Sequence, residues 1–509
     1  MAVRSTHSPS KIPTIYRCDS KGRENQTVAA DMHGTLLIDR SLFPYFAVIA
    51  FDVGGILRLL LLLLTAPLAW FLHHFVSGSA GIRVLVFASF AGVKVSEIES
   101  AAKAVLPKHY SEDLHPETWR VLSSCGRKCV LTESPRIMVE PFLKNYLGVD
   151  LVLGAEISSW RGVATGFVGG AGVLVGEEKA MALRKAFESS SAPEIGIGDS
   201  EADFPFMNLC KERYIVPSDQ RVRPVKQDEL PKPMIFHDGR LVQKPSPMMA
   251  LLIIVWFPIG VLLSVSRVLI GSNSPISLFY YIMQLTGCKI LVKGTPPPNA
   301  KNSGRTGVAF VCSHKTVMDP LFVSAVLGHN TTCVSYSVSR ITEFLSPIRN
   351  CRLTRERSKD AKIIKDILEE GWDLVMCPEG TTCREPYLLR FSSLFAELTD
   401  EIVPVAINVR TSMFHGSTAR GRKWLDIFFF FMNPLPVYEI TFLDKLSLDQ
   451  TCSAGKSSFD VANNVQEMIG AALKFECTKF TRKDKYRMLA GTDGLVGQKP
   501  GAVAADKLS

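Results

Sequence analysis

Residues 308–320 read VAFVCSHKTVMDP, and this stretch decides how the second half of the chain folds. The four apolar residues at its start are typical of a short buried strand. His314 follows this strand, and Asp319 stands five positions further on. Five residues make more than one helical turn. We therefore expect His314 at a strand-to-helix bend, with Asp319 reaching back from the helix.

The same alternation of strand and helix occurs in both halves of the chain. With 509 residues, the chain exceeds the roughly 250–300 at which a single core stops growing, so two domains are expected. The predicted strands are residues 128–131, 151–153, 308–311, 374–377 and 402–407, and residues 177–188 are a predicted helix. Short apolar strands that alternate with helices predict two α/β domains built on parallel sheets.

Apolar blocks set the expected boundaries. Residues 59–72 and 245–266 carry no charge, and runs of this kind suit membrane-associated helices. The expected order is a flexible N-terminus (1–25), a first α/β domain (26–244) with a membrane-embedded insertion (42–93), membrane-associated helices (245–288), a second α/β domain (289–490) and a disordered tail (491–509).

Composition restricts the partners and the compartment. The apolar share of 47% and the mean hydropathy of +0.15 favour membrane contact. A net charge of +9 favours anionic partners, but charge alone does not choose among nucleic acid, phosphorylated metabolites, coenzyme A and an acidic bilayer. The 12 cysteines are scattered without zinc spacing, which indicates reduced thiols inside the cell. The first thirty residues lack the apolar run of a secretory signal.

The His314 and Asp319 pair has the residue types that acyl transfer to an alcohol needs. A base takes the hydroxyl proton, and a carboxylate orients and stabilises the imidazolium. Residues 349–357 contain four arginines, whose guanidinium groups match phosphate oxygens. The turn at residues 377–384 reads CPEGTTCR, and we expect it to be exposed, with Glu379 accepting from hydroxyls and Arg384 facing a phosphate.

In this order the blocks resemble the motifs of the glycerolipid acyltransferase superfamily (PlsC-like). The longer runs at residues 377–392 and 480–486 resemble the plant glycerol-3-phosphate acyltransferases of cutin, suberin and pollen-wall lipid synthesis. The resemblance implies one-step transfer from acyl-CoA to glycerol 3-phosphate with His314 as base and Asp319 as its partner, and no required cofactor. It also implies an acceptor site formed by Arg355, Glu379, Gly380, Thr381 and Arg384, with Pro404 on the acyl-CoA side.

The front half resembles the haloacid-dehalogenase (HAD-like) phosphatases. Its first motif, normally D-x-D-G-T, here reads DMHGT from Asp31, so His33 replaces the second aspartate. In that family the first carboxylate is the phosphoryl nucleophile and the second is the acid. The matching residues, with the three aspartates as expected Mg²⁺ ligands, are Asp31, Thr132, Lys179, Asp199 and Asp203. We expect a site with little or no phosphatase activity because of His33.

The resemblance also bears on topology and leaves alternatives open. Asp31 precedes the first apolar block and Thr132 follows it, so the block must return to its starting side. We favour a re-entrant arrangement for the second block and a membrane location at the endoplasmic reticulum, with the mitochondrion as the alternative and no nucleic-acid partner. A lysophospholipid acceptor and a bifunctional enzyme that releases monoacylglycerol remain alternative functions.

Overall fold

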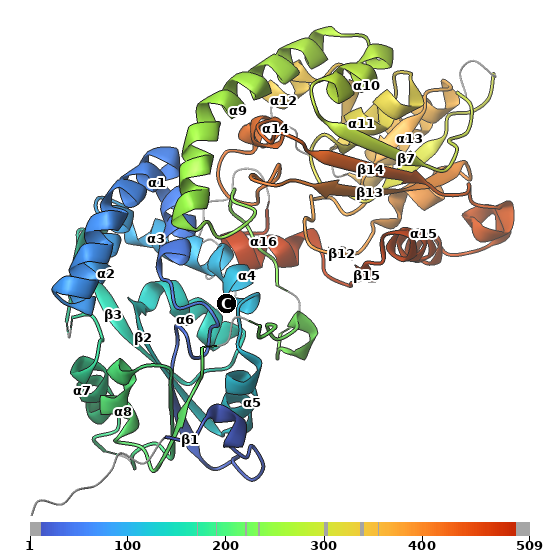
Figure 1. The fold of residues 1–509 in the computed structure, drawn as a ribbon. Coiled ribbons are helices and arrows are strands. Elements are labelled where there is room, and N and C mark those ends of the chain that lie inside the picture. The colour runs from blue at the N-terminus through green and yellow to red at the C-terminus, as the bar shows by residue number, and fades with distance from the viewer. Residues whose placement is uncertain are drawn as a thin grey trace, which may run out of the picture. The chain divides into compact units, whose positions relative to one another are not determined.

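The computed structural model describes residues 12–170, 172–189, 191–218, 221–232, 235–299, 304–335, 340–354 and 356–494 (Figure 1). The chain divides into two compact units. The front unit comprises Met1–His237 with Gln243–Ile254, and the rear unit comprises Asp238–Val242 with Val255–Ser509. Each unit is built around its own sheet, as the two predicted α/β domains require.

The front unit contains a six-stranded sheet in the order β4-β3-β2-β1-β5-β6. Its strands are β1 (Thr27–Asp31), β2 (Arg127–Pro135), β3 (Leu151–Trp160), β4 (Val163–Gly169), β5 (Ile195–Gly198) and β6 (Glu212–Ile215). All pairs are parallel except β3 with β4, which form an antiparallel hairpin at the edge. The helices are α3 (Val95–Ala104), α4 (Leu106–Ser111), α5 (Pro116–Ser124), α6 (Arg136–Asn145), α7 (Glu177–Ala186) and α8 (Phe204–Met207).

The insertion after β1 folds into a helical hairpin of α1 (Phe43–Phe75) and α2 (Gly78–Phe90). Gly55 interrupts α1 with a φ of 65°, a conformation that glycine adopts without steric cost. Before this kink, residues 43–51 are buried. After it, apolar side chains are exposed, among them Leu64 (69%) and Phe75 (68%). Only the second part of α1 therefore offers an apolar surface.

The rear unit contains a seven-stranded sheet in the order β10-β9-β11-β8-β13-β14-β7. Its strands are β7 (Lys289–Lys293), β8 (Ala309–Cys312), β9 (Thr332–Ser335), β10 (Arg349–Arg352), β11 (Leu374–Met376), β13 (Ile402–Arg410) and β14 (Val437–Phe442). The pairs are parallel except β13 with β14. A two-stranded sheet joins β12 (Tyr387–Leu388) to β15 (Glu476–Cys477). The main sheets are largely parallel, as expected for α/β domains, and each also carries one antiparallel pair that was not predicted.

The sequence indicates the central strands of the rear unit because they are continuously apolar. β8 and β11 are buried along their whole length, as parallel strands covered by helices on both faces must be. The helices that alternate with these strands along the chain, or come after them, are α11 (Asp319–Leu327), α12 (Arg340–Leu345), α13 (Arg357–Glu369), α14 (Asp426–Phe431), α15 (Ser458–Leu473) and α16 (Arg482–Ala490). Because β8 and β11 pair in parallel, their carboxyl ends lie at the same edge of the sheet.

The apolar helices α9 (Pro247–Asn273) and α10 (Ile276–Leu285) precede this sheet. In the described residues, α1 and α9 are the two helices long and apolar enough to cross a membrane. Arg267 on α9 is fully buried and donates to the carbonyls of Phe431 and Asn433 at 2.7 and 2.8 Å, and to those of Thr286 and Pro434. These contacts attach one face of α9 to the C-terminal ends of α10 and α14.

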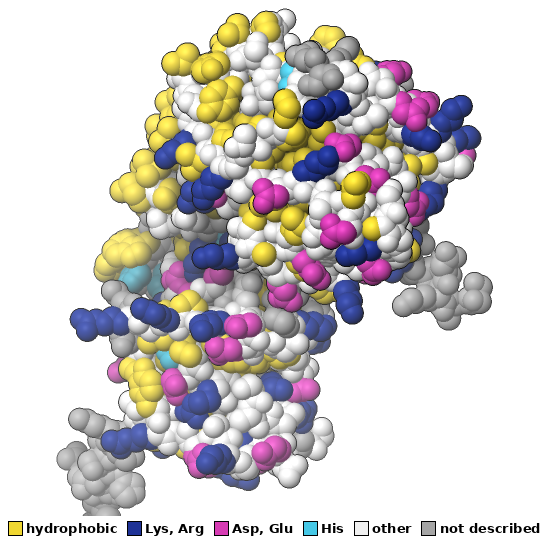
Figure 2. All heavy atoms as spheres, turned by 90° about the vertical axis from the view of Figure 1, so that its right-hand side faces the viewer, with side chains coloured by type: hydrophobic (Ala, Val, Ile, Leu, Met, Phe, Trp, Pro, Cys, Tyr) yellow, Lys and Arg dark blue, Asp and Glu magenta, His cyan; other side chains and the backbone are white. Residues whose placement is uncertain are grey.

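The opposite face of α9 exposes apolar side chains. Exposure reaches 58% at Val255 and 73% at Leu262. Figure 2 shows hydrophobic side chains gathered along one edge of the upper part of the view, while charged side chains of both signs are scattered over the rest of that face. A helix that is hydrogen-bonded to the rest of the protein on one face and exposes apolar side chains on the other is suited to lie at a bilayer surface.

Candidate active site

His314 and Asp319 come together as the sequence predicted. His314 lies just after β8, and Asp319 is the first residue of α11. The imidazole Nδ1 is 2.9 Å from Asp319 Oδ2. The His314 side chain is 19% exposed, whereas that of Asp319 is fully buried. Because Nδ1 faces the carboxylate, Nε2 is the ring nitrogen left to act on a substrate.

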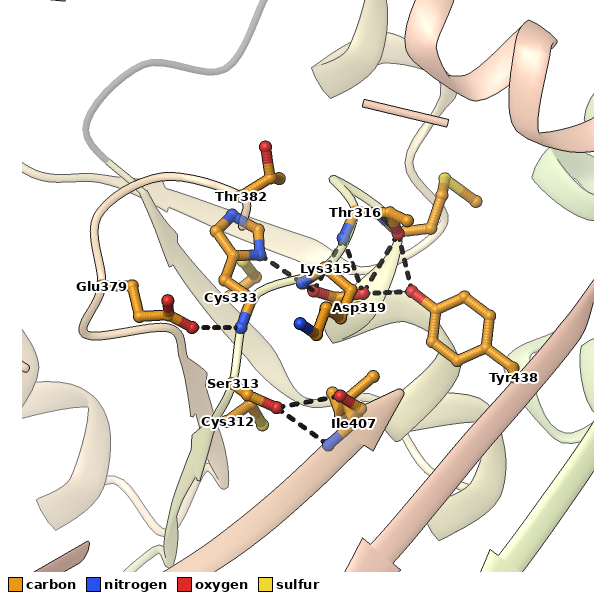
Figure 3. A network of polar contacts seen from close by, with 12 residues as sticks. Cys312, Ser313, Lys315, Thr316, Asp319, Cys333, Glu379, Thr382, Ile407 and Tyr438 are labelled. Carbon is orange, nitrogen blue, oxygen red and sulfur yellow. Dashed lines mark hydrogen bonds and ion pairs between the residues drawn. The ribbon is translucent and has the colours of Figure 1, made fainter. Parts of the chain in front are cut away.

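Four further donors hold the Asp319 carboxylate. The backbone N–H groups of Lys315 and Thr316 donate to Oδ2 at 2.6 and 3.0 Å, and the Thr316 hydroxyl donates to Oδ1 at 3.1 Å. The Tyr438 hydroxyl, from β14, also donates to Oδ1 (Figure 3). Charge-assisted bonds of this kind stabilise the ionised carboxylate and fix its orientation. Lys315, Thr316 and Tyr438 were not predicted; a tyrosine 119 residues away from the motif carries no local signal.

The Glu379 turn lies against the same loop, but it is not the exposed turn that we expected. Glu379 is 4% exposed, and Thr381 is 7% exposed. Glu379 Oε1 accepts from the backbone N–H of His314 at 2.7 Å, and Oε2 accepts from that of Leu389 at 3.0 Å. Burial raises the pKa of Glu379 above its ordinary value. The carboxylate thus holds the histidine loop in place, and its contact with substrate hydroxyls stays a prediction.

Gly380 lets the chain turn at this point. Its φ of 69° lies in the left-handed region, where a side chain would be strained. The turn then returns to the histidine, since the N–H of Cys383 donates to the carbonyl of His314 at 2.6 Å. The backbone of His314 is therefore held on both sides by one glycine turn.

Arg384 is buried among partners of its own unit. Its guanidinium donates to the carbonyls of Gly239 at 2.9 Å and of Ser417, and lies 3.5 Å from Asp238 Oδ1. Burial lowers the pKa of Arg384. These contacts tie the segment at residues 238–242 to the turn, and the predicted contact of Arg384 with a phosphate stays a prediction.

Two other predicted residues have different outcomes. Arg355 lies outside the described residues. Pro404 is buried on β13, where it stands opposite Val311 of β8, and its carbonyl accepts from the N–H of Leu443 at 3.0 Å. Pro404 therefore belongs to the core of the sheet beside the histidine strand, and its link to acyl-CoA stays a prediction.

An apolar pocket opens next to the histidine loop. Its cavity volume is about 60 Å³, and Val317 and Met318, which stand between His314 and Asp319, line it. Further walls come from α9, α10 and α14, with Val268, Phe279 and Phe431 among the lining side chains. An apolar cavity of this kind suits a hydrocarbon ligand better than a polar one.

The front unit brings its predicted residues together at the carboxyl ends of β1, β2 and β5. Asp31, Asp199 and Asp203 place carboxylate oxygens within 4.8 Å of one another. Lys179 Nζ lies 2.7 Å from Asp31 and 2.8 Å from Asp203. Thr132 is fully buried on β2, beside the strand of Asp31. The geometry of a phosphatase-type site is therefore formed.

The carboxylates fit Mg²⁺ by their chemistry, since it prefers hard oxygen ligands. The three predicted ligands Asp31, Asp199 and Asp203 would hold the ion, although Asp203 Oδ2 also accepts from the N–H groups of Asp199 and Ser200. Arg40, at 2.6 Å from Asp199 Oδ2, would compete with the ion for that oxygen.

His33 has the surroundings of a neutral residue. Its Nε2 lies 2.9 Å from Ser134 Oγ, and Nδ1 is buried without a hydrogen-bond partner in the described structure. Burial, with Lys179 and Lys244 nearby, lowers the pKa of His33 to about 3. A neutral imidazole is a poor proton donor at neutral pH, and that His33 does not replace the missing carboxylic acid stays a prediction.

Comparison with known proteins assigns the class of each unit. An acyltransferase family model matches residues 296–408, which contain His314, Asp319 and the Glu379 turn. A second model, described as the HAD-like domain of RAM2-like glycerol-3-phosphate acyltransferases, matches residues 27–216. The rear unit is therefore an acyltransferase domain, and the front unit is a HAD-like domain.

The chain belongs to the glycerol-3-phosphate acyltransferase family. It is 64% identical to glycerol-3-phosphate acyltransferase RAM2 of Petunia hybrida, over 93% of this chain and 99% of that one. It is 40% identical to glycerol-3-phosphate acyltransferase 1 of Arabidopsis thaliana, over 94% of this chain and 83% of that one. A crystal structure of the 1-acyl-sn-glycerophosphate acyltransferase PlsC from Thermotoga maritima covers 44% of this chain and 95% of its own, with 15% identity and a TM-score of 0.30.

Proposed function

We propose that the chain transfers a fatty acyl group from acyl-CoA to a hydroxyl of glycerol 3-phosphate, giving acylglycerol phosphate. The observation that carries the proposal is the bond between His314 Nδ1 and the buried Asp319, which leaves Nε2 to act as the base. The relatives named for this activity align with nearly the whole chain.

In the proposed reaction His314 Nε2 takes the proton of the acceptor hydroxyl. The hydroxyl oxygen forms a bond to the thioester carbonyl carbon, the carbon–sulfur bond breaks, and the leaving coenzyme A sulfur takes the proton from the imidazolium. Asp319 does not take up the proton, and its carboxylate stabilises the imidazolium between these steps. Each step uses groups that the chain and the two substrates supply.

The acyl chain of the donor is proposed to enter the apolar pocket beside Val317 and Met318. With about 60 Å³ the pocket holds only part of a long chain. The exposed apolar side chains of α9 and α10, such as Leu262 and Leu285 (87%), would meet the remainder together with lipid. This arrangement favours a protein that rests on the membrane, and the endoplasmic reticulum, where glycerolipids are made, is the proposed location, with the mitochondrion as the alternative.

The front unit is proposed to contribute no phosphatase step. The carboxylates and Lys179 are in place. However, burial lowers the pKa of His33 and keeps its imidazole neutral, and Arg40 forms an ion pair with the Asp199 carboxylate. Acylglycerol phosphate, a precursor for membrane or extracellular glycerolipids, is then the final product. The unit's roles that remain are folding and placement at the membrane.

The test is an assay of the protein in membranes with labelled acyl-CoA and two acceptors, glycerol 3-phosphate and a lysophospholipid. The proposal expects label in acylglycerol phosphate. Label transferred only to the lysophospholipid would make the chain a lysophospholipid acyltransferase. Abundant monoacylglycerol that disappears in Asp31→Asn would contradict the inactive front unit.

A further inference from the structure

Three lysine side chains gather around the Glu379 turn from different parts of the rear unit. Lys315 Nζ donates to the carbonyl of Glu385 at 2.9 Å. Lys485, from α16, is 3% exposed and donates from Nζ to the carbonyl of Thr382. Lys423 Nζ contacts the Tyr486 hydroxyl and lies 4.7 Å from the centre of that ring.

Among the described residues, the printed partners of these ammonium groups are two backbone carbonyls and a phenol, with no carboxylate within 4 Å; Lys315 and Lys485 are buried, and Lys423 is exposed. Two acids of this region are engaged elsewhere: Asp484 accepts from Thr481, and Glu385 accepts from the Cys383 thiol at 3.2 Å. Lys315 lies near enough to Glu379 to act against the rise in the pKa of that carboxyl, so Lys315 has a partial counter-charge. A buried cation without a counter-charge is unfavourable unless a ligand supplies the charge. Lys485 is the strongest case, because a carbonyl satisfies only one of its three donors.

The local field is positive enough to act on a neighbouring group. Burial alone would raise the pKa of the Tyr486 phenol, but Lys423 and Lys485 outweigh burial and leave this pKa below its ordinary value. The Thr381 side chain acts in the same direction, which places the turn, the phenol and the two lysines side by side. An added anion would be stabilised there for the same reason as the phenolate.

The cluster also lies close to the reacting base. Lys485 holds Thr382, and the next residue, Cys383, donates its N–H to the His314 carbonyl. Arg384, which the sequence suggested for an anion, is bonded to Asp238 instead. When the reacting group of a substrate faces His314, a negatively charged group on the same substrate would therefore lie near Lys423 and Lys485.

We propose that Lys423 and Lys485, with the Tyr486 hydroxyl, form a phosphate-binding subsite beside the Glu379 turn. The ligand chemistry is a phosphate monoester, carried either by the acceptor glycerol 3-phosphate or by coenzyme A; this subsite rests on the proposed function. Lys485 and Tyr486 belong to α16, so the C-terminal helix takes part in substrate binding.

The experiment compares Lys423→Gln and Lys485→Gln with Lys483→Gln, a matched control on the exposed side of α16. Steady-state constants are measured for glycerol 3-phosphate, for acyl-CoA and for acyl-pantetheine, which lacks the nucleotide phosphates. We expect each site variant to raise the KM of one phosphate-bearing substrate by about tenfold or more, the effect of losing one charge-assisted hydrogen bond. Lys485→Arg should recover most of the loss, which separates charge from packing.

The outcomes distinguish the two sources. A raised KM for glycerol 3-phosphate alone assigns the subsite to the acceptor. A raised KM for acyl-CoA but not acyl-pantetheine assigns it to coenzyme A. Unchanged KM values in both variants, or an equal effect of Lys483→Gln, overturn the proposal.

Binding of inorganic phosphate, followed as a thermal shift of the intact protein, needs no turnover. A shift in the wild type that both site variants lose supports the subsite even if the acceptor proves to be another molecule. No shift at any phosphate concentration, with wild-type KM values in the variants, refutes it.

Discussion

Tyr438→Phe should slow acyl transfer without weakening the binding of either substrate. The hydroxyl donates to Asp319 Oδ1 and contacts the Thr316 hydroxyl at 2.6 Å. The ring is stacked on Phe322 with centroids 4.0 Å apart, and phenylalanine keeps this packing. The substitution therefore removes the hydroxyl's bonds to Asp319 and Thr316 and leaves the packing of the ring in place.

The magnitude follows from the donors that Asp319 keeps. A hydrogen bond to a charged group contributes about 1.5–3 kcal/mol, which corresponds to roughly ten- to a hundredfold in rate if it is fully expressed in the transition state. The N–H groups of Lys315 and Thr316 remain on the carboxylate. We therefore expect the lower end, a fall in kcat of about tenfold, because the carboxylate becomes less firmly oriented toward His314.

The assay is a double-mutant cycle with Asp319→Asn, read as kcat and KM with labelled acyl-CoA. If Tyr438 acts through Asp319, adding Tyr438→Phe to Asp319→Asn should cost little more. A merely structural tyrosine would reduce activity equally in both backgrounds and lower the melting temperature in step. Equal losses in the two backgrounds, or a wild-type kcat in Tyr438→Phe, would show that Tyr438 does not act through Asp319.

Three other perturbations follow from the described contacts. Arg267→Leu removes the donors to four backbone carbonyls, two of them in buried contacts, and should cost about 3 kcal/mol or more, a fall in Tm of roughly 6–12 °C, with Arg267→Lys intermediate; an unchanged Tm would contradict the attachment of α9. His33 has a pKa of about 3 in the folded protein and 6.5 as its ordinary value, so only the unfolded chain takes up this proton between these values. The contribution of His33 to the free energy of unfolding is therefore complete above pH 6.5 and is lost as the pH decreases. Between pH 7 and 5 the Tm of His33→Asn should fall less than that of the wild type. Equal falls in Tm for the two proteins would argue against a buried neutral imidazole. Gly380→Ala places a side chain at a φ of 69°, costs about 1 kcal/mol of strain and should lower kcat by displacing the histidine loop, whereas a wild-type kcat would show that the turn tolerates it.

The sequence predicted those parts of the molecule whose signals are local. β8 and β11 are continuous apolar runs, and both were predicted within one residue at each end. The His314 and Asp319 pair was predicted to meet across a strand-to-helix bend because five residues separate the two side chains, and their 2.9 Å contact confirms this.

The parts of the fold and of the site that the sequence did not predict depend on contacts between segments far apart in the chain. Tyr438 reaches Asp319 only because β14 pairs antiparallel with β13, which reverses the direction expected from strand and helix alternation. The turn at Glu379 looked exposed because it is polar, but its polar groups are satisfied inside the unit. The partner of Arg384 is Asp238, 146 positions earlier, and no periodicity links the two.

The role of His314 as the general base is tested by the turnover of His314→Ala with labelled acyl-CoA and glycerol 3-phosphate. The protein would be compared with the wild type at equal amounts in membranes, with Tm as the measure of folding. Loss of the general base predicts a fall in kcat of about 10²–10⁴-fold or more at an unchanged Tm. A folded His314→Ala protein that forms acylglycerol phosphate at close to the wild-type rate would show that His314 is not the base.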